Sequence, residues 1–208
     1  MTGHFYQDPR LAYTPKPSKP FLFLCPLCLP QPPTATMPRL HHKNKQDYQK
    51  EKLIMLSELS QIVFENDGSL RDIFVLNTSE QDWQIMLNFL RQSSYPFEFT
   101  IDGTPQELPD SVKTIFDLRQ EHSTQLCIDR QELVINSFFF TEEEIDFDIH
   151  PRDINTGDKV ERLLEFMRTI SKLLNKEIIL TPQMSETNPW YRFNPVTENE
   201  IWYLCEVI

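Results

Sequence analysis

Apolar residues recur at helical spacing in three parts of the chain. From Asp47 to Leu59, leucines fall near the 3.6-residue period and charged residues fill the other face, which predicts an amphipathic helix. A second helix is predicted after Thr78 or Ser79, since either side chain can accept a hydrogen bond from a free N–H of the first turn. Its apolar face would consist of Trp83, Met86, Leu87 and Leu90. The widest apolar stripe predicts a third helix over Asp158–Asn175.

Strands are predicted where apolar residues alternate with polar ones or form short runs between turn residues. Gln61–Phe64 and Ile73–Leu76 flank the turn sequence Asn66–Ser69, a pattern that is typical of a β-hairpin. Further strands are predicted at Phe97–Ile101, Gln125–Ile128, Leu133–Phe140, Glu177–Leu180 and Glu200–Val207. Residues 138 to 140 are all Phe, so the strand that contains them is expected to be covered on both faces, inside the sheet.

The remaining segments are predicted to connect these elements. Pro105 to Pro109 is interpreted as a loop, residues 112–118 as a short helix or strand, and residues 141–153 as an acidic connection. The order of the elements indicates an α+β fold in which two principal helices pack on a mainly antiparallel sheet.

The first part of the chain has neither a helical nor a strand period. Nine prolines lie between Pro9 and Pro38, and proline both fixes φ and lacks a backbone donor. We therefore expect an irregular, Pro-rich and basic tail at residues 1–46, disordered or artefactual, before a single acidic α+β domain at residues 47–208. In the second case, Met37 or Met55 would be the biological start.

Two other interpretations of this tail each have partial support in the sequence. The apolar run at residues 21–29 faintly resembles a signal peptide, but Pro26 interrupts it. Cys25 and Cys28 have the spacing of zinc ligands. The adjacent His41 and His42, however, cannot both turn inward from one short loop to complete the site.

The charge of the chain is unevenly distributed. The 208 residues have a net charge of −11; residues 1–36 carry +2 and residues 37–52 carry +3, so residues 53–208 carry −16. Such a domain repels nucleic acid and anionic membrane surfaces and attracts a basic protein partner or cations. Plain solubility is the alternative explanation for the excess of acids.

Five carboxylates lie close together in the acidic connection: Glu142, Glu143, Glu144, Asp146 and Asp148. Apolar residues alternate with the last of them, so Asp146 and Asp148 would share one face of an extended segment. Oxygen-rich clusters can bind calcium or magnesium, but the turn glycine of a calcium loop is missing. We interpret the cluster as an acidic edge that either faces solvent or binds a partner.

Aromatic residues gather near the end of the chain. Trp190 and Arg192 lie in a predicted loop, Asn188–Pro195, and are candidates for an interface because exposed Trp and Arg side chains anchor many protein complexes. Trp202 or Tyr203 is expected in the core instead, since an alternating strand turns one of the two inward.

The sequence contains no recognisable catalytic motif. G-x-S-x-G, H-E-x-x-H and G-x-G-x-x-G are all absent. We therefore predict no catalytic residue, no metal and no cofactor. The alternative is a hydrolase-like enzyme whose site is assembled by the fold around His122 or His150, the two histidines of the domain.

Four segments of the domain carry a loose family likeness: Phe138–Phe140, Ile145–Asp148, Pro151–Ile154 and the helix–strand unit Leu163–Pro182. In these segments the chain resembles small acidic α+β proteins of bacteria, some of them akin to toxin-immunity proteins. The resemblance covers about the last 150 residues and implies a cytoplasmic protein that masks a basic toxin through its acidic surface. The sequence therefore favours a non-enzymatic protein-binding module that contacts neither nucleic acid nor membrane.

Overall fold

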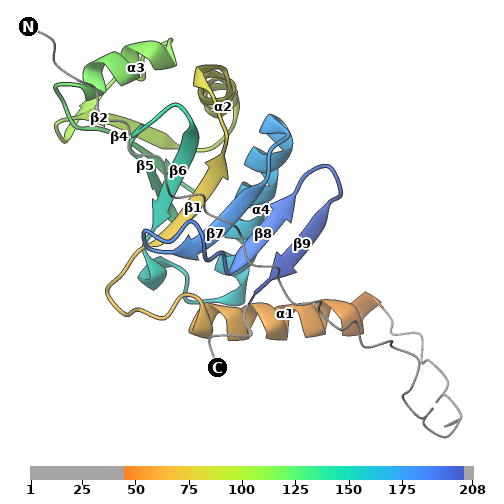
Figure 1. Ribbon diagram of the computed structural model, residues 1–208. Coiled ribbons are helices and arrows are strands. Elements are labelled where there is room, and N and C mark those ends of the chain that lie inside the picture. Colours follow the sequence, from red (N-terminus) through yellow and green to blue (C-terminus); the bar gives the residue numbers. More distant parts are fainter. Residues whose placement is uncertain (1–44, 204–208) are drawn as a thin grey trace, which may run out of the picture. The chain divides into compact units, whose positions relative to one another are not determined.

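The computed structural model describes residues 45–203, which form an α+β fold with four helices and nine strands (Figure 1). The helices are α1 Lys45–Ile62, α2 Glu80–Gln92, α3 Val112–Arg119 and α4 Gly157–Leu174. The strands are β1 Arg71–Leu76, β2 Phe97–Ile101, β3 Thr104–Gln106, β4 Thr124–Asp129, β5 Val134–Ser137, β6 Glu144–Ile149, β7 Ile178–Pro182, β8 Tyr191–Asn194 and β9 Asn199–Trp202. A short 3-10 helix, η1, spans Pro151–Asp153.

Residues 1–44 and 204–208 lie outside the described residues. Nearly all of the predicted tail is therefore outside them, as are its candidate zinc ligands and the end of the last predicted strand. None of the described helices is long and apolar enough to cross a membrane.

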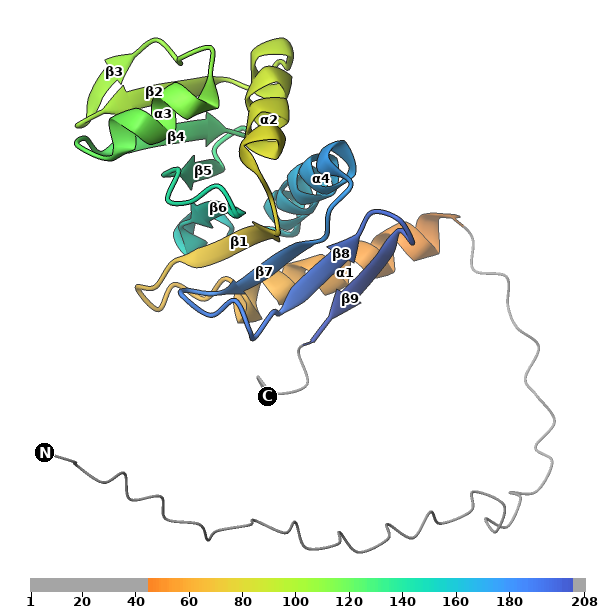
Figure 2. The same cartoon turned by 45° about the horizontal axis from the view of Figure 1, so that its top comes forward.

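All nine strands belong to one antiparallel sheet with the order β3-β2-β4-β5-β6-β1-β7-β8-β9 (Figure 2). Strand β1 lies between two strands that come much later in the chain. Its residue Phe74 is opposite Asp146 of β6 on one side and opposite Ile179 of β7 on the other. The centre of the sheet is thus made of non-local pairs, whose register is set by the burial of one strand face rather than by a local turn.

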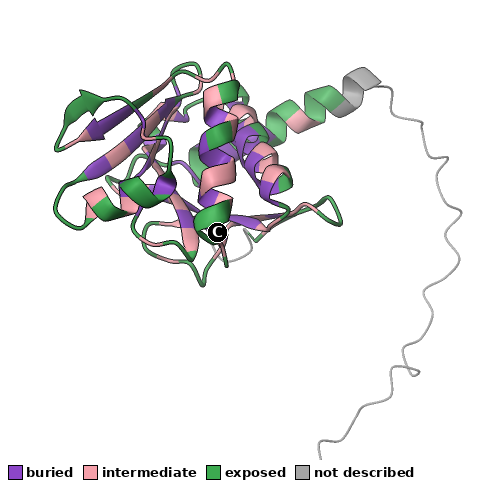
Figure 3. Ribbon diagram, turned by 90° about the horizontal axis from the view of Figure 1, so that it is seen from above, coloured by how far each residue is buried: buried purple, intermediate pink, exposed green. Residues whose placement is uncertain are grey.

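One face of this sheet packs against helices and forms the main core. The buried side chains that β1 and β6 contribute to it are Ile73, Val75, Ile145, Phe147 and Ile149. The apolar stripe of α4 packs nearby, and the rings of Phe147 and Phe166 meet edge to face with centroids 5.3 Å apart. In Figure 3 the strands carry long buried segments, whereas much of α1 is exposed.

Polar residues cap the two helices with the clearest sequence signals, and the N-cap of α2 is one of the two that the sequence predicts. At the start of α2, the Ser79 side chain accepts a hydrogen bond from the N–H of Asp82. At the start of α4, Thr156 accepts one from Lys159, and Asn175 ends the helix in the left-handed conformation with φ 53°. The predicted apolar face of α2 is confirmed, since all four of its residues are buried.

A second group of aromatic side chains fills the core beside α2 and α3. Phe139 lies at its centre, with its ring centroid 4.8 Å from Trp83 of α2 and 6.2 Å from Phe99 of β2. The indole N–H of Trp83 donates to the carbonyl oxygen of Thr141 over 3.0 Å. Helix α2 is therefore anchored to the β5–β6 connection as well as to the sheet.

Helix α1 packs on α4 through its buried residues Leu56 and Leu59. The two helices approach closely at Gly157, where an added Cβ would lie 3.2 Å from the backbone nitrogen of Ser57. With α1, the described residues contain four helices, so the expectation of two principal helices is not confirmed.

The hairpin predicted for Gln61–Leu76 is wrong. Gln61 is one of the last residues of α1, and only Arg71–Leu76 is a strand. The buried guanidinium of Arg71 donates to the carbonyl oxygens of Val63 and Glu65 over 2.7 and 2.9 Å. These carbonyls, which follow the end of the helix, thus bind a side chain rather than a neighbouring strand.

The strand predicted at Leu133–Phe140 is shorter than expected. It lies inside the sheet, between β4 and β6, but it ends at Ser137. Phe139 has a φ of 57°, a left-handed conformation that a strand does not contain. The turn at this residue brings Phe139 into the core and leaves Phe140 58% exposed.

Three segments that the sequence predicts to be connections contain strands. Residues 144–149 form β6, an inner strand between β5 and β1, so the acidic cluster is not at an edge of the sheet. Residues 191–194 form β8, so the predicted loop Asn188–Pro195 is correct only up to Trp190. Strand β3, Thr104–Gln106, overlaps the start of the predicted loop Pro105–Pro109. Each of these strands is specified by pairing with a neighbour, which local composition does not reveal.

Candidate functional site

Four carboxylates lie together on the sheet face opposite the helices. Strand β6 alternates, so Glu144, Asp146 and Asp148 point to this face while the apolar residues between them are buried. In the register of β1 and β6, Asp72 is opposite Asp148 and Phe74 is opposite Asp146. Directly opposed side chains have Cβ atoms about 5 Å apart. We call Asp72, Glu144, Asp146 and Asp148 the acidic patch.

The acidic patch lines a pocket of about 540 Å³. Phe74 contributes an aromatic ring between the acids, and two connections supply the walls. The β5–β6 connection contributes Phe138 and Phe140, and the β7–β8 connection contributes Met184. Volume and lining are in the range of small-molecule and side-chain binding sites, which are mainly apolar with a few polar groups.

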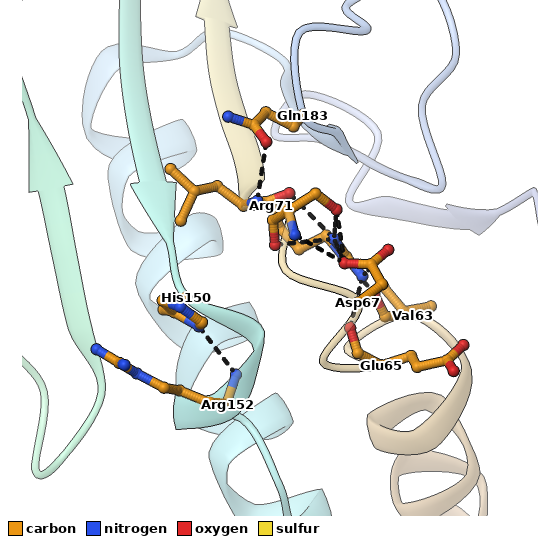
Figure 4. A network of polar contacts seen from close by, with 9 residues as sticks. Val63, Glu65, Asp67, Arg71, His150, Arg152 and Gln183 are labelled. Atoms are coloured by element: carbon orange, nitrogen blue, oxygen red, sulfur yellow. Dashed lines mark hydrogen bonds and ion pairs between the residues drawn. The ribbon is translucent and has the colours of Figure 1, made fainter.

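Hydrogen bonds attach the β7–β8 connection to the sheet. The backbone N–H of Met184 donates to Oδ2 of Asp72 over 2.7 Å. Next to it, Oε1 of Gln183 accepts a hydrogen bond from the N–H of Leu70 over 3.1 Å (Figure 4). This wall of the pocket is therefore positioned by the strand that carries Asp72.

The opposite wall is an aromatic pair. The rings of Phe138 and Phe140 stack with centroids 5.7 Å apart. The guanidinium carbon of Arg119 lies 4.9 Å from the centroid of Phe140, and its Nε donates to the carbonyl oxygen of Phe138. Helix α3 thus supports this wall through one arginine.

The loop before β1 is fixed by Arg71, as Figure 4 shows. Besides the carbonyls of Val63 and Glu65 after α1, its guanidinium donates to Asp67, Ser69 and the carbonyl of Leu70. Leu70 lines both the pocket and a second one of about 340 Å³ beside it. The network therefore sets the position of one residue that the two pockets share.

The surroundings of the acidic patch oppose its ionisation. Burial, with the charges of Glu144, Asp148 and Asp72, raises the pKa of Asp146 to about 6. Burial also raises the pKa values of the other three acids. Oδ1 of Asp146 is buried and has no hydrogen-bond partner among residues 49–203. Four such groups, kept close and partly desolvated, lower the stability of the fold while they are charged.

Several cations in the described part of the chain pair with acids outside the acidic patch. Arg168 binds Glu161 and Glu200 over 2.7 and 2.9 Å, and Arg192 binds Glu177 over 2.6 Å. Within residues 49–203, no Lys, Arg or His nitrogen forms an ion pair with a carboxylate of the acidic patch. The patch therefore presents negative charge that the fold does not neutralise.

No protein-family model, curated protein or solved structure matches this chain. The pocket and its chemistry are therefore the basis on which a function can be inferred. The resemblance to toxin-immunity proteins stays a prediction.

The predicted site residues separate into three groups. Glu144, Asp146 and Asp148 lie in the pocket, as described. Glu142 and Glu143 are exposed in the β5–β6 connection outside it, and their carbonyl oxygens accept hydrogen bonds from Thr78. The Thr141 hydroxyl binds the Glu143 carboxylate, which lowers the pKa of Glu143.

Trp190 and Arg192 form the third group and lie away from the pocket. Neither is in an open loop: Arg192 belongs to β8 and is paired with Glu177. Trp190 is half-buried, with its ring centroid 5.2 Å from the guanidinium of Arg71. Both side chains already have partners within the fold.

The last strand was expected to turn either Trp202 or Tyr203 into the core. Trp202 packs against Tyr191, whereas Tyr203 is 42% exposed. The expectation therefore fits Trp202.

The two histidines of the domain have separate surroundings. Nδ1 of His122 lies 2.7 Å from Oδ2 of Asp102, and both side chains are exposed. His150 accepts a hydrogen bond from the N–H of Arg152 at the start of η1 and lines the second pocket. In the described residues, no hydroxyl or thiol hydrogen-bonds to either imidazole.

Metal binding requires ligands that converge on one point. Within residues 49–203, no three or more His, Cys, Asp or Glu side chains are grouped so that they could hold a metal ion. The acids of the patch are spread along two strands, which suits an extended positive group better than a single ion.

Sequence reasoning missed Asp72, Phe74 and Met184 as pocket residues. Asp72 had one usable signal, its position directly before the apolar run Ile73–Leu76 of β1. The signal could not be interpreted without the partner strand, because β6 is more than sixty residues further along the chain. Phe138 and Phe140 were singled out, but as parts of a strand.

Proposed function

We propose that this chain is a non-enzymatic protein-binding module, similar in role to toxin-immunity proteins, which binds a basic partner through the acidic patch. One observation carries the proposal. Five carboxylates, those of the acidic patch and Glu186, line one pocket without a cationic partner in the described residues, whereas Arg168 and Arg192 elsewhere in the fold are paired with acids. A basic partner would supply the missing positive charge and recover the stability that the patch costs.

The charge of the whole domain supports the same partner. Residues 53–208 carry a net charge of −16, which would accelerate the encounter with a basic protein and repel acidic ones. The resemblance to immunity proteins narrows the partner to a basic toxin, whose positively charged site the patch would cover. The charge of the domain would set the association rate and the choice of partner, and the aromatic pocket would supply the shape complementarity.

The hydrolase-like alternative has less support. His122 and Asp102 form a pair, but Asp102 is not among the residues that line the pockets described above, and His150 serves as the N-cap of η1. A nucleophile activated by either imidazole would need to lie within hydrogen-bond distance of it. The acidic pocket therefore remains the better guide to function.

The test is a capture experiment with the full chain and two triple variants. The patch variant is D72N/D146N/D148N; the matched control, E58Q/E121Q/E165Q, removes the same charge from exposed positions away from the pocket. Each protein is immobilised and offered lysate from the source organism at about 0.05 and 0.5 M salt. Between these two concentrations the screening of surface charges increases strongly. Bound proteins are identified by mass spectrometry, and their binding is re-measured with purified components.

We expect a basic protein that binds wild type and control at low salt, is lost from the patch variant, and is released at high salt. Capture that is equal for the patch variant and the control would contradict the proposal. So would binding that is unaffected by salt. Inhibition of a captured toxin by wild type but not by the patch variant would establish the immunity role.

A further inference from the structure

We infer that the group which enters the pocket is an arginine side chain of the partner, in preference to a lysine. This inference rests on the proposed function, because it names the chemistry of the group that the acidic patch binds. It is drawn from the spacing of the acids, the buried oxygen of Asp146 and the aromatic wall.

The acids are spaced for a donor that spans more than one carboxylate. Asp72 and Asp148 face each other across β1 and β6, and Asp146 follows two residues along β6. That step along a strand is about 7 Å. A guanidinium presents five N–H donors in one plane and can bind two carboxylates at once, whereas an ammonium is a compact point charge.

The buried oxygen of Asp146 favours a hydrogen-bond donor whose desolvation costs little free energy. Oδ1 of Asp146 is buried and lacks a hydrogen-bond partner among residues 49–203, and the residue lines the pocket. Guanidinium is more weakly hydrated than ammonium and stays protonated in proteins. Arginine therefore loses less hydration than lysine when it reaches this depth, and it keeps its charge there.

The aromatic wall favours a planar cation. Phe138 and Phe140 form one side of the pocket, and Phe74 lies on its floor. The chain already places one guanidinium, that of Arg119, 4.9 Å from the centroid of Phe140. Arginine stacks on aromatic faces more often than lysine does. The apolar side chains of Leu70 and Met184 would cover its methylene stem.

The test uses three small probes and the full chain labelled with ¹⁵N. The probes are N-acetyl-arginine methylamide, N-acetyl-lysine methylamide and the neutral isostere N-acetyl-citrulline methylamide. Each is titrated at pH 7.5 and low salt while amide chemical shifts are followed. We expect the arginine probe to bind about tenfold more tightly than either other probe, with shifts at Phe138, Asp146 and Met184.

Two variants localise the effect. Asp146→Asn should remove the preference for arginine, and Phe140→Ala, at an exposed position, should weaken the arginine probe several-fold without unfolding the protein. Equal binding of lysine and arginine would overturn the inference while the capture experiment could still support the proposed function. Shifts outside the pocket, or no binding of the arginine probe, would also overturn it. Salt-independent capture would contradict the proposed function by itself.

Discussion

The guanidinium of Arg71 donates to the carbonyl oxygen of Val63 over 2.7 Å and thereby joins the end of α1 to the start of β1. Arg71 is only 2% exposed, and its other donors bind Asp67, Ser69 and Glu65. The next residue along the strand, Asp72, is part of the acidic patch. The buried arginine thus fixes the loop beside the pocket, while the neighbouring carboxylate points to the opposite face.

The first prediction concerns this network. Arg71→Ala should lower the free energy of unfolding by about 3 kcal/mol, because it leaves buried carbonyl groups without donors and opens a cavity. Urea denaturation measures the change. Asp67→Ala, which removes a half-exposed partner of the same arginine, should cost clearly less. Similar losses for the two variants would show that burial of Arg71 is not the source of the stability.

The second prediction concerns the charge on Asp146. Its pKa in the folded protein is about 6, above the ordinary value of 3.8. The folded state therefore binds this proton more tightly than the unfolded state, so ionisation lowers stability progressively between about pH 4 and pH 6, and fully above that. Asp146→Asn should then stabilise the fold by about 1–2 kcal/mol at pH 7.5 and have little effect at pH 4.

Denaturation curves at the two pH values test this sign. Glu165→Gln, which removes the same charge from an exposed position on α4, controls for the general effect of lower net charge. A larger gain from Asp146→Asn at pH 4 than at pH 7.5 would refute the assignment. If the same variant also loses its partner, the patch trades stability for binding.

The third prediction separates two adjacent aromatic residues. Phe139 is buried against Trp83 and Phe99, so Phe139→Ala should cost about 3–5 kcal/mol. Phe140 is 58% exposed at the wall of the pocket. Phe140→Ala should therefore leave the melting temperature almost unchanged and weaken binding of the partner. Thermal unfolding and titration of the two variants would distinguish these roles, and the reverse pattern would disprove them.

The fourth prediction concerns the end of α4. Asn175 has a φ of 53°, where an alanine side chain is strained and glycine is not. Asn175→Ala should lower the free energy of unfolding by about 1 kcal/mol, and Asn175→Gly should change it by a few tenths at most. Chemical denaturation of both variants gives the comparison. Equal stability of the two would mean that the left-handed conformation is not retained.

Most of the helices could be predicted because their signals are local. The apolar stripe of α4 and the caps Thr156 and Asn175 all lie within or next to one segment of the chain. The same holds for α2, whose cap Ser79 and buried face are contiguous. Strand β2 was predicted with its observed bounds, since its alternating residues stand between Pro96 and the turn at Asp102.

The errors have a common origin in long-range partners. β6 was interpreted as a connection because its acids suggest a solvent-exposed segment, yet its alternating apolar residues pack in the core. The hairpin before β1 was predicted from Asn66–Ser69. The carbonyls that follow α1, those of Val63 and Glu65, instead accept hydrogen bonds from the buried side chain of Arg71. Nothing within a short window of sequence specifies either outcome.

The sequence by itself determined that the chain carries a strongly acidic α+β body and that Asp146 and Asp148 share one face of an extended segment. Both depend only on composition and on the two-residue period of a strand. Only the tertiary structure decided that Asp72 lies opposite Asp148, that Phe138 and Phe140 wall the same pocket, and that no described cation neutralises it. The reason is physical: the electrostatic energy of a charged side chain depends on the groups around it in space. β-pairing brings those groups together from distant parts of the chain.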